Sequence, residues 1–390
     1  MTEPYFNDSD EEMEYLIRYE RRKRIRYERQ RRMRRRRIIK RCLYLGMFVI
    51  VVAIGIATVV SGSKQKADDI LLTVQDVDMT QLADAFKMAD AAKKEDTEEK
   101  IKESEGEEET PAYHFVTTPD TASIYSEEVI SANAILVDES TDTVVASKGA
   151  NERIYPASMT KVLTVLVAAE QISEEDLDDT FTMTLEITDY AYVNDCSSVG
   201  FLDEEKIPVR DLFYGTVLPS GGDAAVGLAT YVAGSHEAFV DMMNEKLEKL
   251  GIADSTHFTN CVGVHDENHY STVYDMAVIM KAAMQNELCR EVLSAHTYAT
   301  ASTEKHPDGI TISNWFLRKI EDKDTGGEVL CAKTGYTDQS KNCAVSYGTS
   351  ADGTPYICVT ACSTSNWRCI YDHVEIYNRY VPEATDTLQS

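Results

Sequence analysis

The stretch Pro156-Ala157-Ser158-Met159-Thr160-Lys161 is followed by an uncharged run from Val162 to Ala169. Because Ser158 and Lys161 are three residues apart, a helix places both side chains on one face. Pro156 is typical of a helix start, and the apolar run predicts a helix that is buried on most sides. Serine is a poor nucleophile without an adjacent base, and a lysine can be that base when burial keeps it neutral. The stretch therefore predicts a serine–lysine pair on a buried helix.

The chain has 390 residues and a net charge of −27, which is unevenly distributed. Residues 1–41 hold 15 Lys and Arg against 8 Asp and Glu, a net of +7, whereas the remainder holds 24 against 58, a net of −34. The length permits one large domain or two ordinary ones, and the composition is that of a globular protein. The acidic body argues against nucleic acid as the ligand of the main domain.

A basic block and a hydrophobic stretch stand near the N-terminus. The block includes the run Arg31-Arg32-Met33-Arg34-Arg35-Arg36-Arg37, and Cys42 to Val60 follows with 19 uncharged residues. As a helix this stretch spans about 28 Å, close to the hydrocarbon thickness of a bilayer. The positive flank predicts a single-pass protein with a cytoplasmic N-terminus and an extracytoplasmic C-terminus. A cleaved signal peptide is the alternative, but both the stretch and its basic leader are longer than is usual for one.

This pattern divides the chain into predicted parts. Residues 1–41 form a cytoplasmic basic segment, which retains the next segment and could also bind nucleic acid or anionic lipid. Residues 42–60 form a transmembrane signal anchor, and residues 61–118 form an acidic, flexible linker that separates the next domain from the membrane. Residues 119–381 form one folded domain, and residues 382–390 form a tail.

The folded domain shows strand-like patterns at both ends and helical patterns between them. The predicted strands are Ala132–Glu139, Thr143–Lys148, Ile310–Asn314, Val329–Thr334, Asn342–Tyr347 and Tyr356–Cys362. Helices are predicted from Ser158, over most of 173–250, and at Tyr274–Met284, Glu287–Ser294 and Asp372–Tyr380. This order predicts an α+β fold, an antiparallel sheet flanked by helices plus a helical lobe, preceded by a single transmembrane helix.

Eight of the nine cysteines lie beyond Cys42, and no Cys-x-x-Cys motif occurs. An even number of cysteines in an exported domain permits disulfides without showing them. Because several of these cysteines lie in apolar, strand-like runs, we expect mostly reduced and buried thiols.

Two later motifs complement the serine–lysine pair. Ser220-Gly221-Gly222 lies on a predicted interhelical loop, where a hydroxyl can relay a proton. Lys333-Thr334-Gly335 ends a strand, which offers a backbone N–H to an oxyanion, a hydroxyl, and a cation for a carboxylate. Taken singly, the Ser158–Lys161 motif also fits a helix cap followed by a solvated lysine. The Ser220-Gly221-Gly222 motif, taken singly, also fits a turn before a helix. All three together favour the catalytic interpretation.

In this combination the chain resembles the serine-type D-alanyl-D-alanine carboxypeptidases, low-molecular-mass penicillin-binding proteins of the β-lactamase and transpeptidase superfamily. The resemblance covers about residues 120–381. It extends over five longer segments, Ile154-Tyr-Pro-Ala-Ser-Met-Thr-Lys161, Leu218-Pro-Ser-Gly-Gly-Asp-Ala-Ala225, Asn260-Cys-Val-Gly-Val-His265, Asn268-His-Tyr-Ser-Thr272 and Ala332-Lys-Thr-Gly-Tyr-Thr-Asp338.

The resemblance implies a membrane-anchored hydrolase of the bacterial cell wall. Its substrate would be a peptidoglycan stem peptide ending in D-Ala-D-Ala, from which it would remove the terminal D-alanine through a serine acyl-enzyme. β-Lactam antibiotics would be covalent inhibitors, the cytoplasmic membrane would be a further partner, and no cofactor or metal is implied.

The resemblance also implies roles for individual residues. Ser158 would be the acylated nucleophile, Lys161 its base, and Ser220 a member of the proton relay. Lys333 would orient Ser220 and add positive potential, and Thr334 would hold the terminal carboxylate of the substrate. These residues are the expected centre of a catalytic domain over 119–381.

The substrate site would be completed by backbone groups. The N–H groups of Ser158 and Tyr336 would form an oxyanion hole, and Gly335 would allow close approach of a backbone. Gly222 stands where the family usually has Asn, and a lost buried polar partner costs ~1–3 kcal/mol, so we expect slower activity. We also expect the substitution Gly222→Asn to keep or raise the carboxypeptidase rate. Ser313 stands where the family has an arginine, so carboxylate binding would be weaker or would use another cation.

Other functions remain open at this point. The departures at Gly222 and Ser313 suit a catalytically weak or inactive peptidoglycan-binding scaffold. A β-lactamase would need a glutamate on a loop followed by Leu-Asn, and the sequence has no such segment. His265 and His269 have the spacing of a metal pair on a helix, but Gly263 before them favours a structural loop.

Overall fold

The computed structural model describes residues 113–125 and 127–381. The predicted cytoplasmic segment (1–41), the predicted anchor (42–60), most of the predicted linker (61–118) and the tail (382–390) lie outside these residues. Within the described residues, no helix is long and apolar enough to cross a bilayer.

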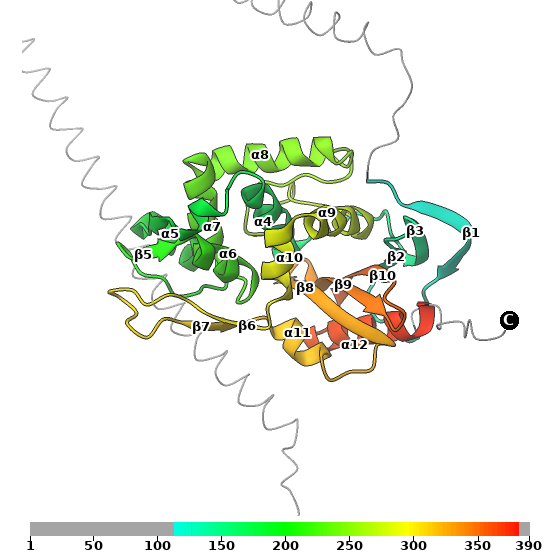
Figure 1. Ribbon diagram of the computed structural model, residues 1–390. Helices are drawn as coiled ribbons and strands as arrows, with labels where there is room; N and C mark the ends of the chain where they lie inside the picture. The colour runs from blue at the N-terminus through cyan, green and yellow to red at the C-terminus, as the bar shows by residue number, and fades with distance from the viewer. Residues whose placement is uncertain (1–112, 126, 382–390) are drawn as a thin grey trace, which may run out of the picture. The chain divides into compact units, whose positions relative to one another are not determined.

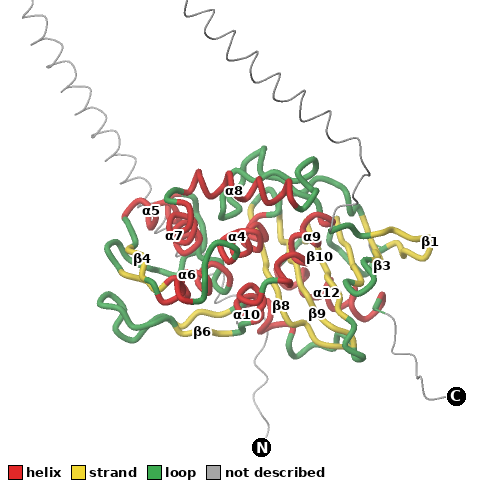
Figure 2. The backbone as a smooth tube through the Cα atoms, turned by 45° about the horizontal axis from the view of Figure 1, so that its top comes forward, coloured by secondary structure: helices red, strands yellow, loops and turns green. Residues whose placement is uncertain are grey.

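An antiparallel sheet forms one side of the described domain (Figures 1 and 2). In the described part of the chain it has six strands in the order β1-β3-β2-β10-β9-β8. Their bounds are β1 Val116–Ser123, β2 Asn133–Asp138, β3 Thr143–Lys148, β8 Gly327–Thr337, β9 Lys341–Ser350 and β10 Pro355–Ser363. All neighbours are antiparallel except β1 and β3. The prediction that early and late strands share one antiparallel sheet is therefore confirmed.

Helices cover both faces of this sheet. Along β2, Ile135 and Val137 belong to the core that includes helix α9 (Val273–Gln285), whereas Ala134 and Leu136 pack with the other face. That second face is covered by α12 (Asn366–Tyr380) and by α11 (Trp315–Ile320). Because strand residues point alternately to opposite faces, β2 is apolar at successive positions.

A helical lobe lies on the other side of the domain, at the left in Figure 1. It contains α5 (Leu185–Val193), α6 (Val209–Val217), α7 (Gly222–Ala233) and α8 (His236–Lys249), with β4 (Thr180–Thr182) and β5 (Lys206–Pro208). Helix α4 (Lys161–Ala169) lies between this lobe and the sheet, next to α9, and α10 (Glu287–Ser294) follows α9. The predicted sheet with flanking helices and a separate helical lobe is confirmed for the described residues.

Several elements differ from the sequence prediction. Strand β1 begins at Val116, before the predicted domain boundary at residue 119. The first helix begins as a short 3₁₀ turn, Ala157–Thr160, and becomes α-helical at Lys161. The short elements β4, β5, β6 (Thr297–Ala299) and α11 were not predicted individually, whereas β7 (Thr311–Ser313) falls within a predicted strand. Short pairings of this kind carry little periodic signal of their own.

The eight cysteines in the described part of the chain are all free, and six of them are buried. The expectation of mostly reduced core thiols therefore agrees with the structure.

Candidate active site

The turn that carries Ser158 places the serine hydroxyl next to the buried amine of Lys161. Lys161, the first residue of α4, is fully buried, and its Nζ donates to Ser158 Oγ at 3.0 Å and to the Val262 carbonyl at 2.7 Å. Burial lowers the pKa of Lys161 to about 8. A substantial fraction of this amine is therefore neutral near physiological pH, as proton abstraction from serine requires.

The Val262 carbonyl is held by a loop that the sequence did not mark as functional. Asn260 Oδ1 accepts hydrogen bonds from the backbone N–H groups of Val262, Gly263 and Val264 at 2.7–3.1 Å. Thr164 of α4 donates to the carbonyl of Cys261 at 2.7 Å. The loop is thus fixed both by its own asparagine and by the helix that begins at Lys161.

A second serine–lysine pair forms between the helical lobe and the sheet. Ser220 lies between α6 and α7 with a positive φ of 61°, and Lys333 lies on β8. Lys333 Nζ donates to Ser220 Oγ at 2.9 Å and to the Thr334 carbonyl at 2.8 Å. Burial, and next the positive charge of Lys161, lower the pKa of Lys333 well below its ordinary value.

Strand β8 also touches the turn of the first pair. A Cβ at Gly335 would lie 2.8 Å from the Ser158 amide nitrogen and 2.9 Å from the Pro156 carbonyl oxygen. Only glycine permits this approach, which brings the backbone of β8 against that of Ser158. Tyr336 follows with an exposed side chain. The three motifs, far apart in sequence, therefore meet at one place, with Ser158, Ser220 and Thr334 all partly accessible.

Gly222, the first residue of α7, has a neighbour that the sequence did not indicate. A Cβ built at Gly222 would lie 2.8 Å from the Cβ of Cys196, closer than real Cβ contacts. This contact argues against the expectation that Gly222→Asn would keep or raise the carboxypeptidase rate. Cys196 gave no motif in the sequence, because its proximity to Gly222 depends on how the loop after α5 folds back.

The position expected to hold an arginine has a guanidinium beside it. Ser313 ends β7, and the next residue, Asn314, donates from Nδ2 to the Ala332 carbonyl on β8 at 2.9 Å. Arg318, one turn into α11, donates to Ser313 Oγ at 3.3 Å. The cation near position 313 thus comes from the following helix.

The two histidines considered as a metal pair lie in a loop. His269 Nδ1 accepts from the Thr259 N–H at 3.1 Å, so Nε2 carries the proton and donates to Thr160 Oγ1 at 2.8 Å. Burial lowers the pKa of His269 to about 3, which keeps the ring neutral. Both ring nitrogens of His269 are engaged in supporting the turn next to Ser158, which leaves no lone pair for a metal.

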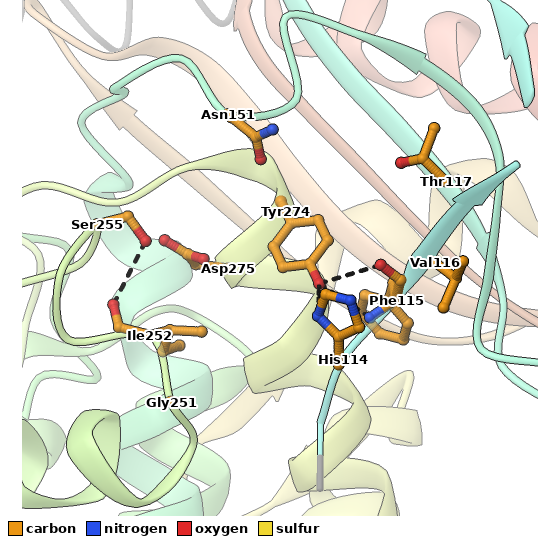
Figure 3. Close-up of a pocket in the computed structure, with 10 residues that line it drawn as sticks. All are labelled: His114, Phe115, Val116, Thr117, Asn151, Gly251, Ile252, Ser255, Tyr274 and Asp275. Atoms are coloured by element: carbon orange, nitrogen blue, oxygen red, sulfur yellow. Dashed lines mark hydrogen bonds between the residues drawn. The ribbon is translucent and has the colours of Figure 1, made fainter. Parts of the chain in front are cut away.

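A cavity of about 480 Å³ lies beside the residues at which the described part of the chain begins (Figure 3). Its lining includes His114, Asn151, Ser255, Tyr274 and Asp275. None of the residues that line this cavity belongs to the three motifs, so it is separate from the candidate active site.

Comparisons with known proteins agree with the fold and the motifs. The chain is 30% identical over 212 residues to the D-alanyl-D-alanine carboxypeptidase DacF of Bacillus subtilis, which covers 54% of this chain and 52% of that protein. It is 30% identical over 260 residues to a D-alanyl-D-alanine carboxypeptidase of Streptomyces sp. strain K15, covering 64% of this chain and 86% of the relative. The crystal structure of the Streptomyces K15 DD-transpeptidase matches with a TM-score of 0.58 and 28% identity, over 67% of this chain and 98% of that one.

The match to the Bacillus relative is partial, since the chain spans about half of that protein's length. The family model for D-alanyl-D-alanine carboxypeptidases matches residues 118–362, which include all three motifs. The chain therefore belongs to the D-alanyl-D-alanine carboxypeptidase family, peptidase family S11.

Proposed function

We propose that the chain is a D-alanyl-D-alanine carboxypeptidase that acts through an acyl-enzyme on Ser158. The observation that carries the proposal is the 3.0 Å hydrogen bond between Ser158 Oγ and the buried amine of Lys161. A neutral amine in this position can accept the serine proton, and burial lowers the pKa of Lys161 to about 8.

The reaction proceeds in two stages. Ser158 Oγ attacks the carbonyl carbon before the terminal D-alanine while its proton passes to Lys161, and the backbone N–H groups of Ser158 and Tyr336 stabilise the oxyanion. Collapse breaks the peptide bond, and the amine of the departing D-alanine takes a proton through Ser220, which Lys333 orients. Water then hydrolyses the Ser158 ester and restores the free hydroxyl.

Recognition of the substrate depends on its terminal carboxylate. Thr334 lies next to Lys333 on β8 and supplies a hydroxyl, and Arg318 supplies a guanidinium beside Ser313. A stem peptide ending in D-Ala-D-Ala presents its carboxylate one residue beyond the scissile bond. A β-lactam is attacked by the same serine and remains attached, which makes it a covalent inhibitor.

The location of the enzyme follows from the sequence. The uncharged stretch 42–60 behind the arginine block suits a single membrane anchor with a cytoplasmic N-terminus, and residues 61–118 suit a linker to an extracytoplasmic catalytic domain of a bacterial cell. Fractionation of cells with protease protection of the 119–381 domain tests this topology; protection in intact protoplasts would contradict it.

A second candidate function is a catalytically weak peptidoglycan-binding scaffold. The bare Gly222 at the start of α7 favours it, because a polar side chain expected there is absent. Release of D-alanine from a peptide ending in D-Ala-D-Ala separates the two, since a scaffold would bind the peptide without turnover.

The proposal is tested by labelling the purified domain with a fluorescent penicillin. We expect covalent labelling of the natural domain, none of Ser158→Ala, and slower but detectable labelling of the matched variant Ser220→Ala. Labelling that persists in Ser158→Ala would refute Ser158 as the nucleophile.

A further inference from the structure

Gly222 and Cys196 form a packed pair beside the motif serine Ser220. A Cβ built at Gly222 would lie 2.8 Å from Cys196 Cβ, 3.4 Å from Cys196 Sγ and 3.4 Å from Ala191 Cβ. The first distance is shorter than real Cβ contacts allow, so something must shift before any side chain can occupy position 222. The space above Gly222 is therefore filled by Cys196.

The end of α5 places Cys196 there. Asp195 has a positive φ of 55°, and the N–H of Cys196 donates to the Ala191 carbonyl at 2.9 Å. The N–H of Asp195 reaches the Tyr192 carbonyl at 3.4 Å, which completes a Schellman motif. In this motif the residue after the left-handed position folds back onto the helix, so Cys196 packs against Ala191 and towards α7.

Asp223 fixes the remainder of the same loop. This buried carboxylate accepts hydrogen bonds from Ser198 Oγ at 2.7 Å and from the N–H groups of Val199 and Gly200 at 2.9 Å each. The N–H of Gly222 itself donates to the Ser197 carbonyl at 2.7 Å. Cys196 is therefore held from both sides, and the loop has little freedom to move away from α7.

We propose that Cys196 is a positioning residue that replaces the missing side chain at position 222 and forms one wall of the Lys161 pocket. The proposal rests on the proposed function, because it concerns the base of that reaction. Cys196 and Gly222 act as one unit, so that either a thiol at 196 or a side chain at 222 can fill the space, but not both.

Cys196 is one of several ionisable groups near Lys161. The ionisable groups that influence Lys161, or that it influences, are Cys196, Cys261, Asp223 of α7, Lys333 of β8 and His269. Burial is the main cause of the lowered pKa of Lys161, and negative charge on Cys196, Cys261 or Asp223 would oppose it. Burial raises the pKa of the Cys196 thiol, so the thiol is uncharged near neutral pH and acts by keeping water from the amine.

A double-mutant cycle with Gly222→Asn, Cys196→Gly and the double variant tests the pair. Gly222→Asn alone should lower the melting temperature by a few degrees and slow penicillin acylation about tenfold or more, because overpacking is destabilising. The double variant should recover most of both losses. Gly222→Ala, which adds only the Cβ, serves in the same cycle if Gly222→Asn does not fold. A Gly222→Asn variant with natural stability and rate would overturn the proposal, as would strict additivity.

The pH dependence distinguishes positioning from simple packing. Cys196→Gly should admit water, raise the pKa of Lys161 and move the midpoint of acylation to higher pH, whereas Cys196→Ser should keep the natural midpoint. An unchanged midpoint in Cys196→Gly would contradict the role at Lys161. If the natural protein is not acylated at all, the proposed function fails, but the melting temperatures of the cycle still decide whether the two positions compete for one space.

Discussion

The two serine–lysine pairs of this domain have similar chemistry but are assembled in different ways. In each, a buried lysine donates to one serine hydroxyl and one backbone carbonyl, with serine distances of 3.0 Å for Lys161 and 2.9 Å for Lys333. A left-handed residue accompanies each serine: Ala157 precedes Ser158, and Ser220 itself has a positive φ. The first pair is three residues apart on one turn, and the second is 113 residues apart.

This difference separates their roles. The two members of the Ser158 pair are brought together by one local turn, whereas the Ser220 pair requires the helical lobe to be docked on β8. Burial lowers the pKa of both amines, and the charge of Lys161 lowers that of Lys333 further. Two buried positive charges repel, so protonation of either amine disfavours protonation of the other.

The largest expected effect comes from removing the base of the local pair. Lys161→Ala should slow acylation by about 10²–10⁴-fold, the usual contribution of a general base, without unfolding the domain. Stopped-flow or gel measurement of penicillin acylation gives the rate. Lys281→Ala, which removes another buried lysine that pairs with Asp142 in the turn between β2 and β3, is the control for loss of a buried amine. A normal rate in Lys161→Ala would exclude it as the base.

A smaller effect is expected for the long-range pair. Lys333→Ala should slow acylation about 10- to 100-fold, the loss of a hydrogen bond to a charged group. The loss should be smaller for a penicillin methyl ester, which has no carboxylate for Lys333 to favour. Equal losses for the acid and the ester would show that Lys333 acts only through Ser220.

The pH profile of acylation reports the protonation of Lys161. Protonation of Lys161 removes the base, so acylation should fall about tenfold per unit as pH decreases below about 8 and should level off above it. Acylation rates measured across about pH 6 to 9 give the profile. A rate that is flat over this range would mean that no amine of altered pKa is the base.

The smallest expected effect concerns the contact that joins the two pairs. Gly335→Ala should lower stability by ~1–3 kcal/mol, because its Cβ would press on the Ser158 amide and the Pro156 carbonyl. Gly227→Ala in α7 is the matched control, since its Cβ would meet the flexible Met183 side chain at 3.3 Å. Denaturant unfolding of both variants measures the difference, and equal stabilities would contradict a tight contact between β8 and the Ser158 turn.

The elements predicted from sequence are those with a strong local signal. Helix α10 has the predicted bounds Glu287–Ser294, and Asn286 caps it by accepting from the Cys289 N–H at 3.0 Å. Strand β3 also has its predicted bounds, because Val144 and Ala146 alternate with partly exposed residues. Strand β1 was not predicted, because it is an edge strand of mostly exposed residues without a buried face to show a period.

The residues of the candidate site also divide into those with a local sequence signal and those without one. Ser158 and Lys161 could be predicted because they are three residues apart on one turn. Ser220 and Lys333 could be predicted because each lies in a short sequence motif. Asn260 and Val262 lie in a segment that carries the family resemblance, but the sequence assigned them no role, and Cys196 lies in no motif. All three residues reach the site through loops whose paths depend on tertiary contacts. The incompatibility between Asn at position 222 and Cys196 is of the same kind.

The central claim is that the serine of the local pair, and not that of the long-range pair, is the nucleophile. The most direct test is mass spectrometry of the purified domain after reaction with benzylpenicillin, with the modified residue located by peptide mapping. We predict one penicilloyl adduct, on Ser158. An adduct on Ser220, or none on either serine, would contradict the account.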